Sequence, residues 1–394
     1  MNIRKITFGN FKSLYNAAFE PGKVNVFIGA NGSGKTTILE AIGLLSAAMT
    51  DRVDSSSLQR KGVRLSIPSL YKSSFKDLKR QRSMIDLSLE WEDDCCTDKF
   101  RYDVHLTTPT DTDYWKYHSE AFLQNGEKIW GRSNASLQQS NSYIGFFLID
   151  NDPELTIGRK IAEDFSSYGI FQPNTLTLRG TIPDPNQVSP VGLNGGRLAE
   201  AIRTLIHEND GDLFFGNLYM DDILDMIDWA SDISVDTPKK TTINANIPTT
   251  RQVIEFTDRY MKDTARFTGY DASEGALYVL FMLTLAMHPM GPSIFSVDSF
   301  DHALNPRLAK KMIQVFCEQI IQNNKHVFLT THNPLVLDGL DLQNDDIRLF
   351  AVDRDSNGYA QIRRISVSQE LIDEGLPLSR LWISGRLGGV PSLL

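Results

Sequence analysis

The sequence predicts an α/β protein in which a parallel sheet is joined by an antiparallel β-subdomain and an inserted, mainly helical subdomain. Three observations lead to this prediction. Near the N-terminus, a buried strand runs directly into a glycine-rich loop and a helix. Alternating polar and apolar residues recur through residues 84–132, as in antiparallel sheets. A strand–helix–strand pattern, typical of parallel sheets, follows residue 251.

Length and composition agree with this prediction. A chain of 394 residues suits two or three structural units. With 41% apolar and 23% charged residues it resembles soluble globular proteins, which excludes the disordered and low-complexity classes. The net charge of −9 argues against a protein that coats nucleic acid with its whole surface, although it leaves room for one local basic patch.

Other sequence features indicate the cellular compartment. The N-terminus lacks the basic start and apolar stretch of a signal peptide, and the longest apolar run, Ala276–Met287, is shorter than the roughly 20 residues that cross a bilayer. Three cysteines, Cys95, Cys96 and Cys317, provide neither a disulfide framework nor a zinc-binding spacing. We therefore expect a cytoplasmic protein with no membrane contact.

The first fifty residues are organised as strand, strand, glycine loop and helix. Alternation over Ile3–Phe8 predicts an edge or half-buried strand, and the apolar run Val24–Ile28 predicts a buried one. Helical spacing predicts a helix over Thr36–Met49, with apolar residues at Ile38, Leu39, Ile42 and Leu45.

The middle of the chain is less regular. Residues 51–83 are rich in serine and basic residues, and alternation over Ile85–Leu89 and Arg101–Leu106 predicts the antiparallel sheet. Residues 133–250 combine clustered prolines with helical stretches, which we place at Leu198–Ile206 and Leu213–Ile227. We therefore divide the chain into a first part of one domain, 1–132, an insert, 133–250, and the second part of the domain, 251–394.

The last third predicts a βαβ unit. An apolar helix spans Ser273–Met287, a short strand over Ser293–Val297 ends at Asp298, and a second strand covers His326–Thr331. A helical face lies between the two strands, at Leu308, Met312, Val315, Phe316 and Ile320. Because α/β sheets bind ligands at the carboxyl ends of their strands, the polar residues found there are candidate site residues.

The segment Gly29–Thr36 fits the phosphate-binding loop G-x-x-x-x-G-K-[ST] in its confirming context of strand and helix. Its glycines let successive backbone N–H groups point at phosphate oxygens, and the helix N-terminus adds partial positive charge. Lys35 is predicted to reach the β- and γ-phosphates, and Thr36 to ligate Mg²⁺.

Three further positions predict parts of the same site. Asp298 ends a buried strand and can anchor Mg²⁺, and His332 ends the next strand, where it can contact a γ-phosphate. Ser273 and Gly275 start the apolar helix and can bind an anion there. Each residue alone has an ordinary structural explanation, namely a strand-terminal carboxylate, a structural histidine or a helix-capping serine. Their order along the chain is the informative feature.

In this order, the motifs resemble the ABC-type ATPase heads of SMC proteins, RecF, SbcC and the OLD family. The segments Gly9–Leu14 and Phe27–Thr37 look like the start of those heads. The stand-alone ATPases of bacterial two-gene defence or toxin-type modules are more similar still. The specific match covers about residues 1–50 and 265–355, and the middle of the chain matches loosely.

The resemblance implies a role for each motif. Catalytic residues would be Lys35, Asp298 and His332, and Mg²⁺ would be held by Thr36 and Asp298. Ser273 and Gly275 would form the signature motif and His302–Asn305 the D-loop. ATP would be bound by the signature motif together with Gly29, Asn31, Gly32, Ser33, Gly34, Lys35, Thr36 and Thr37. In this class the signature motif of one protomer caps ATP on the other, which implies a head-to-tail homodimer or a higher assembly with ATP between its subunits.

One departure from the family pattern affects hydrolysis. Relatives have glutamate directly after the Mg²⁺-binding aspartate, and Ser299 occupies that position here. General-base assistance contributes about 10²- to 10⁴-fold, so we expect slow or negligible ATP hydrolysis unless Asp301 acts through a water. The glutamine that couples the two lobes in relatives stays unassigned, because neither Gln138 nor Gln139 has a flanking motif.

Two other segments contain candidate functional residues. Arg60–Arg82 holds eight basic residues against one acid, so it is a candidate contact for DNA, RNA or tRNA, for an acidic partner protein, or simply a solvated face. Asp353-Arg354-Asp355 resembles the DxD of a metal nuclease, but the following Ser356-Asn357-Gly358 favours a β-hairpin turn.

The favoured function is an ATP-binding head that regulates a separate effector, a nuclease or toxin, in anti-phage defence. The alternative is a DNA-repair or chromosome-associated ATPase of the RecF/SMC type, against which the chain shows no long heptad-bearing coiled coil. A transporter ATP-binding subunit is the third class. Its L-S-G-G-Q signature corresponds here to Ala272–Ala276, which differs from it, and its glutamate is absent.

Overall fold

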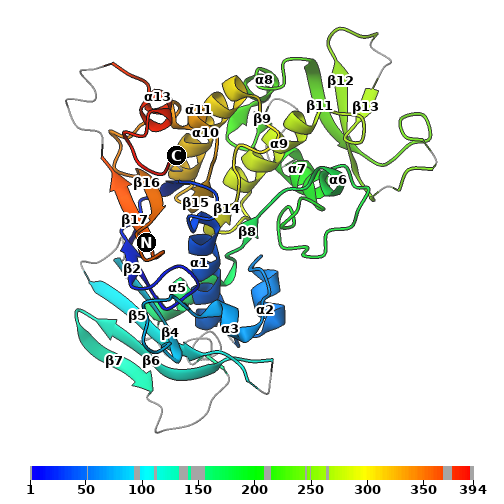
Figure 1. The fold of residues 1–394 in the computed structure, drawn as a ribbon. Helices are drawn as coiled ribbons and strands as arrows, with labels where there is room; N and C mark the ends of the chain where they lie inside the picture. The colour runs from blue at the N-terminus through cyan, green and yellow to red at the C-terminus, as the bar shows by residue number, and fades with distance from the viewer. Residues whose placement is uncertain are drawn as a thin grey trace.

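The structure is a computed structural model, and it describes residues 2–50, 52–92, 98–110, 113–132, 141–142, 156–207, 214–244, 246–248, 250–262, 266–366 and 375–390. Two six-stranded sheets dominate this part of the chain, and a three-stranded sheet projects from one side (Figure 1). The predicted combination of a parallel sheet with an antiparallel β-subdomain is confirmed.

The central sheet has the strand order β17-β16-β3-β15-β14-β8. All neighbours in it pair in parallel except β17, which lies antiparallel to β16 at one edge. The strands are β3 (Val24–Ile28), β8 (Ile170–Phe171), β14 (Ile294–Val297), β15 (His326–Thr330), β16 (Ile347–Arg354) and β17 (Ala360–Ile365). Their parallel pairing brings the carboxyl ends of β3, β14 and β15 to one edge of the sheet.

The antiparallel sheet has the order β2-β1-β4-β5-β6-β7. Its strands are β1 (Asn2–Gly9), β2 (Ala17–Phe19), β4 (Met84–Glu92), β5 (Lys99–Thr107), β6 (Lys116–Gln124) and β7 (Glu127–Arg132). β1 pairs on both sides, so it is an interior strand, and its alternating sequence reflects one face turned to the core.

The helices cover both faces of the central sheet. α1 (Lys35–Thr50) lies between the two large sheets together with α5 (Thr156–Ser166), which explains why most of its side chains are buried (Figure 1). α7 (Leu198–His207), α9 (Glu274–Met287) and α10 (Pro306–Gln322) pack on the other face. The short helices are α2 (Ser55–Arg60), α3 (Pro68–Tyr71), α6 (Thr175–Leu178), α8 (Met220–Leu224), α11 (Pro334–Leu337) and α13 (Leu378–Ile383). None of the described helices combines the length and apolarity needed to cross a bilayer.

Successive side chains of β3 point to opposite faces of the central sheet and belong to the apolar clusters on both faces. Phe27 packs with Phe328 and Phe350 in the apolar cluster that contains α1. Val26 and Ile28 belong to the cluster that contains α9 and α10. Because both faces of this strand are buried, the end of β3 and the loop that follows it are held from both sides.

The insert differs from its prediction in two places. The predicted helix over Leu213–Ile227 begins as a hairpin of β9 (Phe214–Phe215) and β10 (Leu218–Tyr219), because Gly216 and Asn217 form a tight turn there. β11 (Ala230–Asp236) pairs with β12 (Val253–Asp258), which pairs with β13 (Arg266–Thr268). The predicted boundary at residue 250 therefore falls inside one sheet. β8, also within the predicted insert, belongs to the central sheet.

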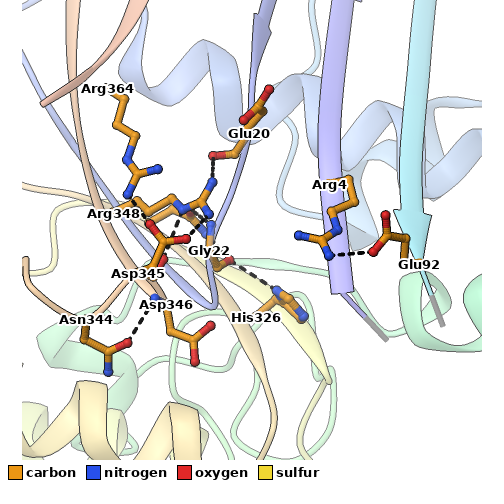
Figure 2. A network of polar contacts seen from close by, with 11 residues as sticks. Arg4, Glu20, Gly22, Glu92, His326, Asn344, Asp345, Asp346, Arg348 and Arg364 are labelled. Carbon is orange, nitrogen blue, oxygen red and sulfur yellow. Dashed lines mark hydrogen bonds and ion pairs between the residues drawn. The ribbon is translucent and has the colours of Figure 1, made fainter. Parts of the chain in front are cut away.

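A polar network ties the two segments that lead into β3 and β16, at the end of the central sheet opposite the glycine-rich loop. Arg348 Nη1 donates to the Glu20 carbonyl at 2.9 Å and Nη2 to the Asp345 carboxylate at 2.6 Å, as Figure 2 shows. Arg364 also donates to Asp345, and the hydrogen bonds from Arg364 and Arg348 lower the pKa of that carboxyl. The network fixes the entry of β3 relative to β16.

The C-terminus of α9 is capped by a buried lysine. Lys325 Nζ donates to the carbonyl oxygens of Leu285 at 3.0 Å and His288 at 3.2 Å, and the residue is 6% exposed. A cation is favourable at the negative end of a helix dipole, but burial lowers the pKa of this lysine to about 8.

We predict that Lys325→Met destabilises the protein by about 2 kcal/mol, because the variant leaves two buried carbonyls without their donor. The folded pKa lies below the unfolded value of about 10.4, so the unfolded chain binds more protons between about pH 8 and pH 10. Wild-type stability therefore gains over that of the variant as pH rises through this window. Urea unfolding at pH 7.5 and pH 9.5 measures the free energy of unfolding of both proteins. A difference between wild type and variant that becomes smaller at the higher pH would contradict the predicted pH dependence.

Candidate nucleotide-binding site

The predicted phosphate-binding loop lies between β3 and α1. The first glycine of this loop is packed against β16: a Cβ at Gly29 would lie 2.3 Å from the Val352 carbonyl oxygen and 2.7 Å from Ser33 Oγ. No side chain fits there, so glycine is required by space. Ser33, Gly34 and Lys35 are buried, whereas Asn31 and Gly32 are exposed at the tip of the loop.

Lys35 points back into the curl of the loop. Its Nζ donates to the carbonyl oxygens of Gly29 at 2.7 Å and Ala30 at 2.9 Å, and the residue is 5% exposed. Burial lowers its pKa to about 8, while the nearby carboxylates of Asp298 and Asp301 act in the opposite direction. A phosphate entering the loop would supply the anionic partner that this ammonium group lacks.

Asp298 joins three segments that are distant in the sequence. Thr36 Oγ1 donates to both of its carboxylate oxygens, at 3.2 and 3.0 Å. Thr330 Oγ1, at the end of β15, donates to it at 2.6 Å and accepts from the Ser299 N–H at 2.8 Å. The carboxylate thus connects the start of α1 with the ends of β14 and β15.

The oxygen atoms of Thr36 and Asp298 suit Mg²⁺, which commonly takes one or two protein ligands and completes its shell with water and substrate phosphates. Among the described residues, no group of three or more His, Cys, Asp or Glu side chains is placed to hold a metal ion. A metal at this position would therefore depend on phosphate oxygens.

His332 follows β15 on the segment that Asp301 holds. Asp301 Oδ1 accepts from Thr331 Oγ1 at 2.7 Å and from the His332 N–H at 3.1 Å. Partial burial and the neighbouring Lys35 lower the pKa of the His332 imidazole, so the neutral form dominates near pH 7. The arrangement brings His332 into the electrostatic surroundings of Lys35 and Asp298.

Ser273 caps α9 and faces solvent. Its Oγ accepts from the Ala276 N–H at 3.3 Å, and its side chain is exposed. Gly275 packs on the predicted D-loop, because a Cβ there would lie 3.2 Å from the Ala303 carbonyl oxygen. Within the described residues, no hydrogen bond links Ser273 or Gly275 to the phosphate-binding loop.

Sequence reasoning missed a charged contact beside the loop. Glu40, one helical turn after Thr36, is fully buried and accepts from Lys12 Nζ at 2.6 Å and Arg64 Nε at 2.7 Å. The hydrogen bond to Glu40 raises the pKa of Arg64, to which Asp298 also contributes. Lys12 belongs to the family-like segment Gly9–Leu14, but nothing local to it signals a partner on α1.

Several predicted residues have other surroundings. Lys61 of the basic segment is buried, and its Nζ donates to the Phe165 and Ser166 carbonyls at the end of α5. Cys317 is a buried free thiol on α10. The candidates Cys95, Cys96, Gln138 and Gln139 lie outside the described residues.

The Asp353-Arg354-Asp355 segment ends β16 and starts a hairpin turn. Gly358 N–H donates to the Asp355 carbonyl at 2.9 Å, and Asp355 Oδ1 accepts from the N–H groups of Asn357 and Tyr359. The Asp355 carboxylate therefore shapes the turn, as the hairpin interpretation predicts.

Two family models match the chain. The model described as "AAA ATPase domain" covers residues 1–150, and the model described as "AAA domain, putative AbiEii toxin, Type IV TA system" covers residues 191–338. The chain also matches two proteins named DNA replication and repair protein RecF. The RecF of Phocaeicola vulgatus is 36% identical over 76 residues, or 18% of this chain and 20% of that protein. The RecF of Renibacterium salmoninarum is 44% identical over 55 residues, or 14% of each chain. The chain thus matches a fifth or less of the length of these curated relatives.

The fold resembles a solved structure, the SMC head domain from Thermotoga maritima. The TM-score is 0.50 at 12% sequence identity, and the alignment covers 93% of this chain and 100% of that domain. At this identity the likeness concerns the fold. Together, the two ATPase models, the RecF matches and this fold support an SMC/RecF-like ATPase of the ABC type.

Proposed function

We propose that the chain binds ATP and Mg²⁺, pairs head to tail with a second copy around two nucleotides, and acts on DNA in the cytoplasm as an ATPase of the RecF/SMC type. One observation carries this proposal. The Asp298 carboxylate accepts from Thr36 and Thr330 directly beside the phosphate-binding loop, so the residues proposed for the triphosphate and its metal are already assembled.

Binding would use groups that this chain holds ready. Backbone N–H groups of the loop and of the α1 N-terminus would bind phosphate oxygens, with Lys35 turning from the Gly29 carbonyl towards them. Thr36 and Asp298 would hold Mg²⁺, which neutralises phosphate charge when bound. His332 would form one hydrogen bond at the γ-phosphate.

Pairing is supported by the exposure of the signature motif. Ser273 is exposed at the N-terminus of a 14-residue helix, and within the described part of the chain its hydroxyl accepts a local hydrogen bond from the Ala276 N–H. A helix N-terminus attracts phosphate. The phosphate that meets this motif would be held by the loop of a second copy.

Hydrolysis is proposed to be slow, because Ser299 offers no base. Its backbone is fixed in a left-handed conformation with φ 62°, where its N–H donates to Thr330 Oγ1 and its carbonyl accepts from Tyr278. Asp301, the remaining acidic candidate, holds the Thr331–His332 segment through Oδ1. We therefore assign Asp301 a positioning role in the switch segment.

The basic segment supports a role on DNA once the members that bind other parts of this chain are set aside. Lys61 caps α5 and Arg64 pairs with Glu40, whereas Lys76, Lys79 and Arg80 are exposed. The segment is anchored beside the β16–β17 turn, because the Phe75 ring contacts the Tyr359 ring at 4.3 Å and Asp77 accepts from the Tyr359 hydroxyl at 2.7 Å. An anchored cationic loop suits contact with the phosphates of a duplex.

Control of a separate effector is the second candidate function. One observation favours it: the model that matches residues 191–338 is described with a toxin–antitoxin system. The RecF matches and the SMC-head fold support the DNA-associated role more directly. Co-purification with the product of the neighbouring gene, with and without ATP, tests the effector role.

We predict that ATP and Mg²⁺ convert the protein from monomer to dimer and that Ser273→Arg abolishes this change. The variant should bind fluorescent mant-ATP within threefold of wild type, because the substitution lies on the face that meets the other copy. Light scattering coupled to size-exclusion chromatography measures pairing. Lys35→Ala should weaken mant-ATP binding by at least about 100-fold and should also abolish dimer formation. Ser231→Arg on β11 should leave both mant-ATP binding and dimer formation unchanged. Dimers of Ser273→Arg that form normally with ATP would refute the proposed pairing.

We predict that wild-type turnover is about 0.1 per second or less, which is a typical rate reduced by the lost general base. Asp301→Asn, which keeps an oxygen acceptor for Thr331 and His332, should change this rate less than threefold. Asp301→Ala should weaken ATP-dependent pairing, because it frees the switch segment. Steady-state phosphate release measures the rates. A loss of about 100-fold in Asp301→Asn would make Asp301 the catalytic base instead.

We predict that replacing Lys76, Lys79 and Arg80 together by Ala weakens binding to double-stranded DNA. The logarithm of the DNA association constant falls with the logarithm of salt concentration, and the magnitude of this slope should decrease by about one for each phosphate that the variant no longer neutralises. Binding of mant-ATP should be unchanged. A control that replaces Lys240, Arg251 and Lys262, exposed residues near β11 and β12, changes the net charge equally. Fluorescence anisotropy over a salt series measures both; equal weakening in the two variants would argue against this segment as the DNA contact.

A further inference from the structure

The C-terminal segment Arg386–Val390 lies against the phosphate-binding loop. After α13, the chain turns at Gly385 and is tied to the β16–β17 hairpin by two hydrogen bonds. Arg363 Nη2 donates to the Leu387 carbonyl at 2.6 Å, and the Gly389 N–H donates to Asp353 Oδ2 at 3.1 Å. The segment is therefore fixed on the same hairpin that supports Gly29.

Gly389 makes the closest approach. A Cβ on this residue would lie 3.2 Å from Gly29 Cα, 3.4 Å from Gly29 N and 3.4 Å from the Ile28 carbonyl oxygen. On its other side, Gly29 meets the Val352 carbonyl, where an added Cβ would lie at 2.3 Å. The first residue of the loop is thus held between β16 and the C-terminal segment. A Cβ on Gly29 would overlap the Val352 carbonyl, and a Cβ on Gly389 would be tighter than an ordinary van der Waals contact with Gly29.

The same segment bounds the space beside the loop. A pocket of about 330 Å³ is lined by Gly29–Asn31 and His332 on one side and by Trp382, Gly389 and Val390 on the other. Trp382 is 7% exposed, so α13 packs this side chain into the body of the protein. The pocket connects the loop with the switch histidine.

We propose that Arg386–Val390 is a positioning element of the nucleotide site, in which the Gly389 backbone holds the first turn of the phosphate-binding loop in its binding shape. The effect on nucleotide affinity rests on the proposed function. The effect on the loop itself does not, because it concerns packing between two segments of this chain. A Cβ at position 389 requires the loop or the segment to shift by a few tenths of an ångström and also strains the backbone there, so it disturbs the contact.

The chain offers a matched pair of glycines for the test. Gly389 and Gly385 have φ values of 70° and 77°, so alanine introduces a similar backbone strain at both. A Cβ at Gly385 meets nothing within 4 Å, whereas at Gly389 it meets Gly29. The difference between Gly389→Ala and Gly385→Ala therefore isolates the contact with the loop.

Hydrogen–deuterium exchange of the peptide spanning residues 24–40 is the primary measurement, made without nucleotide. Gly389→Ala should speed exchange in this peptide at least fivefold, and Gly385→Ala less than twofold, with a peptide from β4–β5 unchanged in both. With mant-ATP and Mg²⁺, the dissociation constant should rise at least tenfold for Gly389→Ala only.

The hydrogen bond from Arg363 to the Leu387 carbonyl provides a second test, because its removal adds no atoms between Gly389 and Gly29. Arg363→Ala removes the donor to the Leu387 carbonyl and should speed exchange in the loop peptide, and Arg363→Lys, which keeps a donor, should restore it. If loop exchange equals wild type in both Gly389→Ala and Arg363→Ala, the positioning role is wrong. If loop exchange rises as expected but the wild-type protein does not bind mant-ATP, the positioning role stands and the proposed function fails.

Discussion

The hydrogen bonds on the Asp298 carboxylate hold the candidate site together, because their donors come from α1 and β15 while the carboxylate follows β14. These three segments meet only when β3 is paired between β15 and β16 in the central sheet. Since β3 is buried on both faces, the two apolar clusters of the molecule both act on the position of the loop that follows it. The packing of the core around β3 therefore determines the position of the candidate phosphate-binding loop.

The parts of the site that are local in sequence were predictable. A phosphate-binding loop needs a strand, glycines and a helix start in one continuous segment, and Gly29–Thr36 contains its whole pattern. Asp298 and His332 were predictable in position because each follows a short apolar strand, and the parallel pairing of β14 with β15 brings these strand ends together. Element periodicity also located α1, α9 and α10 to within one or two residues at most ends.

Contacts between distant segments were beyond sequence reasoning. Glu40 is an ordinary helix residue until the fold brings Lys12 and Arg64 to it, and Lys61 resembles a surface charge although it caps a buried helix end. The pair Gly388-Gly389 was the available signal for the C-terminal contact, but two adjacent glycines do not indicate what approaches them. Biological role was likewise less accessible than fold: the comparisons support an ATPase of the SMC/RecF class, the alternative interpretation, better than a role in phage defence.

The position of Gly29 between β16 and the C-terminal segment has a consequence for biosynthesis. Val352 and Gly389, which pack against the loop, are translated more than 300 residues after it. A nascent chain therefore carries an unfinished loop through most of its synthesis, and a product terminated before these residues lacks the packing that shapes it. Under the proposed positioning role, the loop reaches its final packing only in a chain extended through residue 389.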